Sequence, residues 1–178
     1  MDLRVKKTER AIRNAFYQLV QTKPVEKITV KELSELAEIN KTTFYAHYET
    51  IYDLVATLEQ EITDMVIQNI DEFQVLFDNP REFVFDLYQI FTTYRTDNFA
   101  PFNPSSQDFA RKLGNAICNE ACRRKVLPEQ YKNLGMLLTF LINGLFGLSK
   151  SNPDSISDSE LDYLATFVEG GIRALPHL

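Results

Sequence analysis

The stretch ITVKELSELAEINKTTFYAHYETIYDL, residues 28–54, predicts two short helices joined by a tight turn. Thr29 and Glu32 have the spacing of a capping box, in which two side chains satisfy free amides where a helix begins. The apolar residues that follow recur at the spacing of one buried helix face. They are Val30, Leu33, Leu36 and Ala37.

The second helix of this stretch carries a dense set of polar side chains. Asn40 is suited to cap it, and Phe44 and Tyr48, four residues apart, define its buried face. An α-helix fits the DNA major groove, where amines and hydroxyls meet base edges and phosphates. The pattern therefore favours a DNA recognition helix. Its outward face carries Lys41, Thr42, Thr43, Tyr45 and His47.

Another amphipathic helix precedes this pair, between residues 8 and 21, and Pro24 ends it. Through the motif Tyr45-Ala46-His47-Tyr48, the first 50 or so residues resemble the TetR family of bacterial transcriptional regulators. The recognition helix of that family typically ends in a tyrosine, two variable residues and an aromatic.

The resemblance implies an all-α protein with two domains. Residues 1–48 would form a helix-turn-helix DNA-binding domain, and residues 49–178 a larger helical domain for effector binding and dimerisation. Phe44 and Tyr48 would belong to the core, and Tyr45 would contact a phosphate. The side chains implied to face DNA are Thr29, Lys41, Thr42, Thr43, Tyr45 and His47.

The chain departs from the family pattern at two positions. The family often has glycine in the turn where this chain has Glu38, and lysine near the start of the next helix where this chain has Ile51. Glu38 then has to accept a conformation that glycine adopts more easily. Arg4, Lys6 and Lys7 are interpreted either as a flexible basic arm that contacts phosphates or as a solvated terminus.

The two parts of the chain carry opposite charge. Residues 1–48 hold nine Lys and Arg against six Asp and Glu, which gives +3, and the remaining 10 against 19 give −9. A small positive face is enough to neutralise a few phosphates and release their counterions. An ordinary solvated run of charge fits the same numbers, so the helical pattern decides in favour of DNA.

The remainder of the chain predicts further amphipathic helices. Thr50 and Asp53 form a capping pair, and an apolar stripe from Ile51 to Phe77 predicts one helix of about 40 Å. Four more helices are predicted. They occupy residues 81–94, residues 105 to about 126, a segment after Pro128, and a segment that begins at the capping pair Ser157 and Glu160.

Aromatic side chains concentrate between residues 83 and 109. One interpretation is ordinary core packing, because buried aromatics usually have that role. The other is a pocket for a small apolar effector, which the TetR resemblance implies. The candidate pocket residues are Phe83, Tyr88, Phe91, Tyr94 and Phe109.

Residues 134–148 are apolar on nearly every helical face, so we expect this helix to be buried all round. A second subunit would cover the face that a small body leaves open, and the resemblance implies an isologous four-helix interface with the last helix. The candidate interface residues are Leu138, Leu141, Leu145, Phe146, Leu164 and Val168.

Other classes of function find little support. With no glycine-rich phosphate loop, nucleophile motif or histidine cluster, we expect no enzyme and no cofactor. Cys118 and Cys122 lack further metal ligands, so no metal site is predicted; they are either inert packed thiols or, beside Arg123 and Arg124, thiols of lowered pKa. Without a secretory signal or an apolar run of membrane-spanning length, we expect a cytoplasmic protein with no membrane partner.

The sequence thus predicts a homodimeric repressor that binds a palindromic double-stranded DNA operator and is released by a small apolar effector. The alternative is a regulator or activator of the same class that responds to a protein partner. A closed apolar cavity among the aromatics would favour the effector, and a solid core would favour the partner.

Overall fold

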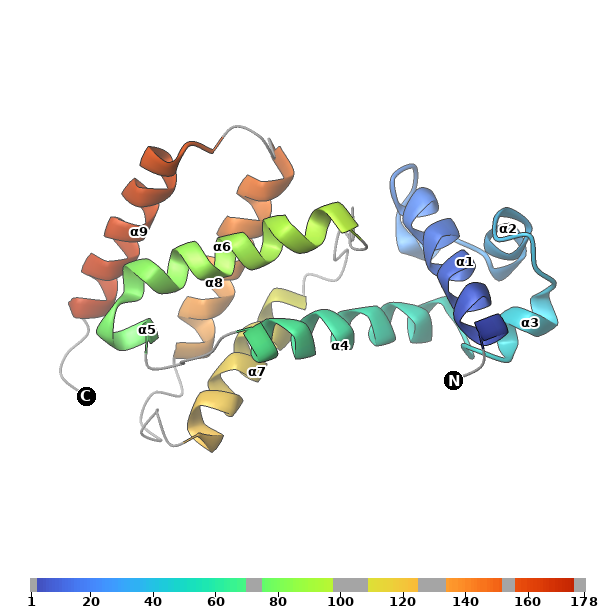
Figure 1. Cartoon of the computed structure of the whole chain (residues 1–178), viewed down its shortest axis with the longest axis horizontal. Helices are drawn as coiled ribbons and strands as arrows, with labels where there is room; N and C mark the ends of the chain where they lie inside the picture. Colours follow the sequence, from blue (N-terminus) through green and yellow to red (C-terminus); the bar gives the residue numbers. More distant parts are fainter. Residues whose placement is uncertain (1–2, 70–74, 98–108, 125–133, 152–155, 175–178) are drawn as a thin grey trace. The chain divides into compact units, whose positions relative to one another are not determined.

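The computed structural model describes residues 3–69, 75–97, 109–124, 134–151 and 156–174. Every regular element within these ranges is a helix (Figure 1). The prediction of an all-α protein is therefore confirmed. The described residues form two compact units, one of residues 3–62 and one of the residues between 63 and 96 and from 109 onward.

The N-terminal unit contains the predicted helix-turn-helix. Its elements are α1 (Leu3–Val20), the 3-10 helix η1 (Val25–Lys27), α2 (Val30–Leu36), α3 (Lys41–Tyr45) and the first part of α4 (Ile51–Asn69). Apolar side chains from all four α-helices are completely shielded from solvent. They are Ile12, Phe16, Leu33, Phe44, Leu54 and Leu58.

Helix α1 begins at Leu3 rather than at Thr8, so the hypothesis of a flexible basic arm is wrong for the residues described. Arg4, Lys6 and Lys7 lie in its first two turns and are exposed. The amphipathic pattern could not reveal these turns, because their side chains face solvent and no apolar residue there enters the core.

The predicted capping box of α2 forms only in part. Thr29 caps the helix, with its Oγ1 accepting a hydrogen bond from the Glu32 backbone N–H at 3.2 Å. The Glu32 carboxylate instead accepts from the ammonium of Lys23. A charged donor makes a stronger hydrogen bond than a backbone amide, which explains why the Glu32 carboxylate binds Lys23 and not the Thr29 N–H.

Helix α4 starts at the predicted capping pair. Thr50 Oγ1 accepts from the Asp53 N–H at 3.0 Å, and the Asp53 carboxylate accepts from the Glu49 N–H at 3.1 Å. The stripe predicted as one helix appears as α4 and a short α5 (Val75–Asp78), and residues 70–74 between them lie outside the described residues. The boundary between the two compact units falls within α4. The domain boundary predicted after residue 48, before α4 begins, stays a prediction.

The C-terminal unit contains α6 (Pro80–Asp97), α7 (Phe109–Arg123), α8 (Leu134–Ser151) and α9 (Asp158–Arg173). The predicted capping box at Ser157 is complete: Ser157 Oγ accepts from the Glu160 N–H, and the Glu160 carboxylate accepts from the Ser157 N–H at 2.9 Å. Arg81 of α6 pairs with Asp162 and donates to Thr166 Oγ1 at 3.2 Å, which ties α6 to α9.

Helices α7 and α8 cross at closely packed glycines. A methyl group placed on Gly114 of α7 would lie 3.1 Å from the carbonyl oxygen of Gly135 and 3.0 Å from Thr139 Oγ1, both on α8. A hydrogen atom is therefore the only side chain that fits at Gly114 without moving the backbone of α8. This crossing fixes which face of α8 is turned toward its own unit.

Candidate nucleic-acid interface

The turn between α2 and α3 uses a backbone conformation that L-residues rarely adopt. Glu38 has φ 54°, in the left-handed region, at the position where a glycine was expected. The Ile39 N–H donates to the Ser34 carbonyl at 3.0 Å and the Glu38 N–H to the Glu35 carbonyl at 3.2 Å, so the end of α2 is closed by backbone bonds. The turn is thus hydrogen-bonded but strained at Glu38.

Replacing Glu38 with glycine is expected to raise the free energy of unfolding by about 1 kcal/mol, because glycine accepts this conformation without steric strain. Urea denaturation followed by circular dichroism measures the change. Glu35→Gly is the matched control: Glu35 lies within α2, where glycine should lower stability by about 1 kcal/mol. A Glu38→Gly variant no more stable than the unmodified protein would contradict the strain.

Helix α3 is anchored by the two aromatics predicted to be core. Phe44 is fully buried and Tyr48 nearly so, which confirms their placement. The rings of Phe44 and Tyr48 lie 5.9 Å apart, and the Tyr45 ring packs edge-on against Phe44 at 5.7 Å while remaining 56% exposed. Tyr45 is thereby held in place with its hydroxyl end accessible.

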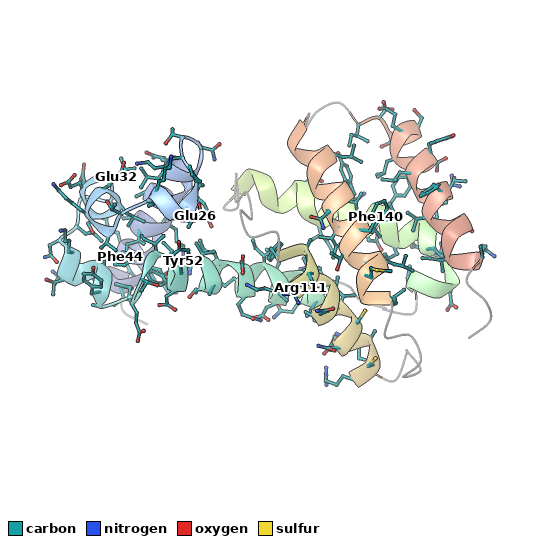
Figure 2. The ribbon with its side chains drawn as sticks, turned by 180° about the vertical axis from the view of Figure 1, so that it is seen from behind. Glu26, Glu32, Phe44, Tyr52, Arg111 and Phe140 are labelled. Carbon is teal, nitrogen blue, oxygen red and sulfur yellow. The ribbon has the colours of Figure 1, made fainter. Side chains whose placement is uncertain are left out.

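The predicted DNA-facing residues lie on the surface of this unit. Lys41, Thr42, Tyr45 and Thr29 are exposed, whereas Thr43 and His47 are half-buried. The structure therefore brings Lys41, Thr42 and Tyr45 together on one short exposed helix. Figure 2 draws the side chains of this unit as sticks and labels Phe44 among them.

Thr43 and Thr29 differ in whether their hydroxyl groups are free to donate a hydrogen bond. Asn40 Oδ1 accepts from both the Thr43 N–H at 2.7 Å and the Thr43 hydroxyl at 2.8 Å. The hydroxyl proton of Thr43 is thus engaged, and only its lone pairs remain for a ligand. Thr29 Oγ1 accepts at its cap, so its proton remains able to donate to a phosphate.

Within the described ranges, some cations of the N-terminal unit form ion pairs with carboxylates, and others do not. Arg13 and Lys23 bind carboxylates within the unit, and Lys31 lies 4.0 Å from Glu35. Lys41, at the start of α3, has no carboxylate within this range among the described residues, so its charge is open to an anionic ligand.

Tyr52 is an exposed residue that the sequence analysis did not single out. It lies in the first turn of α4 and is 60% exposed (Figure 2). The apolar stripe through Ile51 and Leu54 faces inward, which already implied that Tyr52 faces outward. Its hydroxyl is a further candidate for a phosphate contact where the expected lysine is missing.

The aromatic residues of the predicted effector pocket are buried wherever their side chains are described. Phe83, Tyr88 and Phe109 are shielded from solvent. The side chains of Phe91 and Tyr94 lie outside the described residues. Burial suits a core residue and a pocket-lining residue equally, so the effector pocket stays a prediction.

Within a single chain, α8 is buried on one face and exposes apolar side chains on another, so its burial on every face, which the sequence predicts through a second subunit, stays a prediction. Leu138, Leu141 and Leu145 of the predicted interface are buried in their own unit, so they do not form its open face. Leu164 and Val168 are half-buried, and the Phe146 side chain lies outside the description. Other large apolar residues are exposed on these two helices: Met136, Leu137, Phe140 and Leu148 on α8, and Tyr163 and Phe167 on α9.

The two cysteines differ in their surroundings. Cys118 is half-buried, and burial raises the pKa of its thiol to about 11, so the alternative of a lowered pKa is wrong for this residue. The neighbouring Arg123 and Arg124 bind Glu120 instead and lower the pKa of that carboxyl to about 2, with the Arg123 hydrogen bonds as the largest cause. The arginine charges are therefore engaged away from the thiols.

Two other kinds of feature are absent from the described ranges. No helix there is both long and apolar enough to cross a membrane. In those same ranges, no group of three or more His, Cys, Asp or Glu is placed to hold a metal ion.

Comparison with known proteins gives a likeness of fold. No protein-family model matches the chain, and no curated protein matches it. Among solved structures, a chain described as "Dihydroxyacetone kinase operon activator DhaS" is similar over 94% of both chains, with 17% sequence identity and a TM-score of 0.47. At this identity and TM-score, the likeness assigns no function.

Proposed function

We propose that the protein is a TetR-like transcriptional regulator that binds a double-stranded DNA operator through α3. One observation carries this proposal: α3 exposes Lys41, Thr42 and Tyr45 together while Phe44, between them, is fully buried. A short helix anchored in this way offers an amine and hydroxyls to the major groove and to phosphates. In this function the protein acts in the cytoplasm, without catalysis.

The proposal includes a homodimer on a palindromic operator. Helices α8 and α9 expose Met136, Phe140, Tyr163 and Phe167, of which Tyr163 is 82% exposed. Large apolar surfaces of this kind mark interaction sites. A two-fold dimer would place two copies of α3 about 34 Å apart, one turn of DNA.

The mode of control has two candidates. A repressor released by a small apolar effector is compatible with the buried aromatics Phe83, Tyr88 and Phe109. A regulator or activator that responds to a protein partner is supported by the same exposed face of α8 and α9, which a different protein could cover. The first is our proposal, because TetR-like proteins commonly bind such effectors.

Selection of bound duplexes from a random DNA pool at low salt, followed by sequencing, tests the proposed function. We expect enrichment of an approximate palindrome that binds two chains. Lys41→Ala and Tyr45→Ala should each weaken binding to that duplex by about 5- to 150-fold, the effect of losing one good base or phosphate contact.

Lys27→Ala provides the matched control, because Lys27 is an exposed cation of the same unit on η1, away from α3. It should leave binding to the selected duplex nearly unchanged. Failure to enrich any sequence, or equal losses for Lys27→Ala and Lys41→Ala, would refute recognition by α3.

A further inference from the structure

A cluster of charged side chains in the N-terminal unit is not used by the proposed DNA contacts. It consists of Arg13 and Glu9 on α1, Glu61 on α4, and Tyr48, which follows α3. Glu61 lies one residue before Ile62, the last residue of this unit, and thus at the point where α4 leaves it. The cluster therefore joins three elements at the exit of α4.

Arg13 binds two carboxylates at once. Its Nη1 donates to Glu61 Oε2 at 2.5 Å, and its Nη2 donates to Glu61 Oε1 at 2.7 Å and to Glu9 Oε1 at 2.8 Å. The pair with Glu61 is bidentate, a geometry that the planar guanidinium matches and a lysine cannot. The hydrogen bond to Glu61 is the largest cause of a raised Arg13 pKa, so the arginine stays charged.

The cluster continues from Glu9 to the recognition helix. The Tyr48 hydroxyl donates to Glu9 Oε1 at 3.4 Å, the same oxygen that accepts from Arg13. Tyr48 in turn packs against Phe44, the buried anchor of α3. Burial is the largest cause that raises the pKa of Tyr48, so its hydroxyl keeps the proton that it donates.

Stability alone is a weak reason for this arrangement. The side chains of Arg13 and Glu61 are 22% and 40% exposed, and ion pairs near the surface contribute little net stability. Partial burial also removes water from three charges, which offsets part of their attraction. What the geometry supplies instead is a fixed orientation of α4 relative to α1 and to Tyr48.

We propose that Arg13 is a positioning residue for DNA recognition, because it joins Glu61 at the exit of α4 to Glu9 and Tyr48 at the end of α3. Breaking the Arg13–Glu61 hydrogen bonds releases the end of α3 from the arrangement in which it binds its operator. This inference rests on the proposed function and adds the residue whose hydrogen bonds link α4 to the end of α3.

The test measures binding to the selected duplex and to a random duplex in parallel, together with urea denaturation. Glu61→Gln keeps the size of the side chain and removes its charge, and Arg13→Met removes the guanidinium. Each is expected to weaken operator binding about tenfold, with random-duplex binding unchanged. The double variant should bind no worse than Arg13→Met alone, because both changes break one interaction.

Lys23→Met is the matched control. The Lys23–Glu32 pair has similar exposure, 26% and 39%, and among the described residues neither side chain forms a hydrogen bond or ion pair with α3 or α4. It should leave the ratio of operator to random-duplex affinity unchanged. Arg13→Lys keeps the charge without the bidentate geometry and should recover only part of the lost affinity.

Three outcomes would overturn the inference. In two of them the unmodified protein selects an operator, but the ratio is unchanged in Glu61→Gln, or it falls equally in Lys23→Met; the proposed function then survives and only the role of Arg13 is lost. In the third the unmodified protein selects no operator, which refutes the proposed function and this inference with it.

Discussion

Replacing Phe44 with alanine is expected to lower the free energy of unfolding by about 3–5 kcal/mol, the cost of truncating a fully buried phenylalanine. Phe44 is fully buried, and its ring contacts those of Tyr45 and Tyr48. Alanine would leave a cavity beneath α3 that the surrounding helices cannot fill completely. A five-residue helix has few other contacts to hold it in place.

Urea denaturation followed by far-ultraviolet circular dichroism measures this loss. Leu36→Ala is the matched control, because Leu36 is an apolar residue of the adjacent α2 that is 44% exposed. It should change stability by less than about 1 kcal/mol. Equal midpoints for Phe44→Ala and Leu36→Ala would show that Phe44 does not anchor α3.

A methyl group at Gly114 is expected to destabilise the C-terminal unit by about 1–3 kcal/mol. The new carbon would lie 3.1 Å from the Gly135 carbonyl oxygen and 3.1 Å from the Thr139 backbone nitrogen. Backbone atoms cannot rotate away as the end of a side chain can, so α7 and α8 would have to separate.

Gly144→Ala is the control for this prediction, because a methyl group there meets no atom of the described residues within 4 Å. Alanine favours a helix interior over glycine, so the unfolding free energy should rise by about 1 kcal/mol. Thermal unfolding at several protein concentrations gives both values. A Gly114→Ala variant as stable as Gly144→Ala would exclude the close crossing of α7 and α8.

Local interactions were predictable from the sequence. The caps at Asn40 and at Ser157 depend on side chains within three residues of the bonds that they make, and the sequence displays that spacing. The buried positions of Phe44 and Tyr48 follow from the helical period for the same reason. The strain at Glu38 was expected from the TetR resemblance, because that family often has glycine in this turn and glycine adopts such a conformation more easily.

Interactions between distant segments were not predictable. The Glu32 carboxylate met Lys23, nine residues earlier, and so did not complete its capping box. Helix α8 is apolar on nearly every face, so its periodicity could not show which face turns inward. The crossing at Gly114 decides that, and it places Leu138 and Leu145 in the unit's own core while Phe140 stays exposed.

Cys118 is half-buried and Cys122 is exposed, so a thiol reagent should label the chain selectively at Cys122. Maleimides react with thiolates, and the raised pKa of Cys118 leaves that thiol almost entirely protonated at neutral pH. Cys122 is exposed on the same helix and free of any disulfide. A fluorophore could therefore be attached at Cys122 of the unmodified chain, and movements of α7 followed in solution without introducing a single substitution.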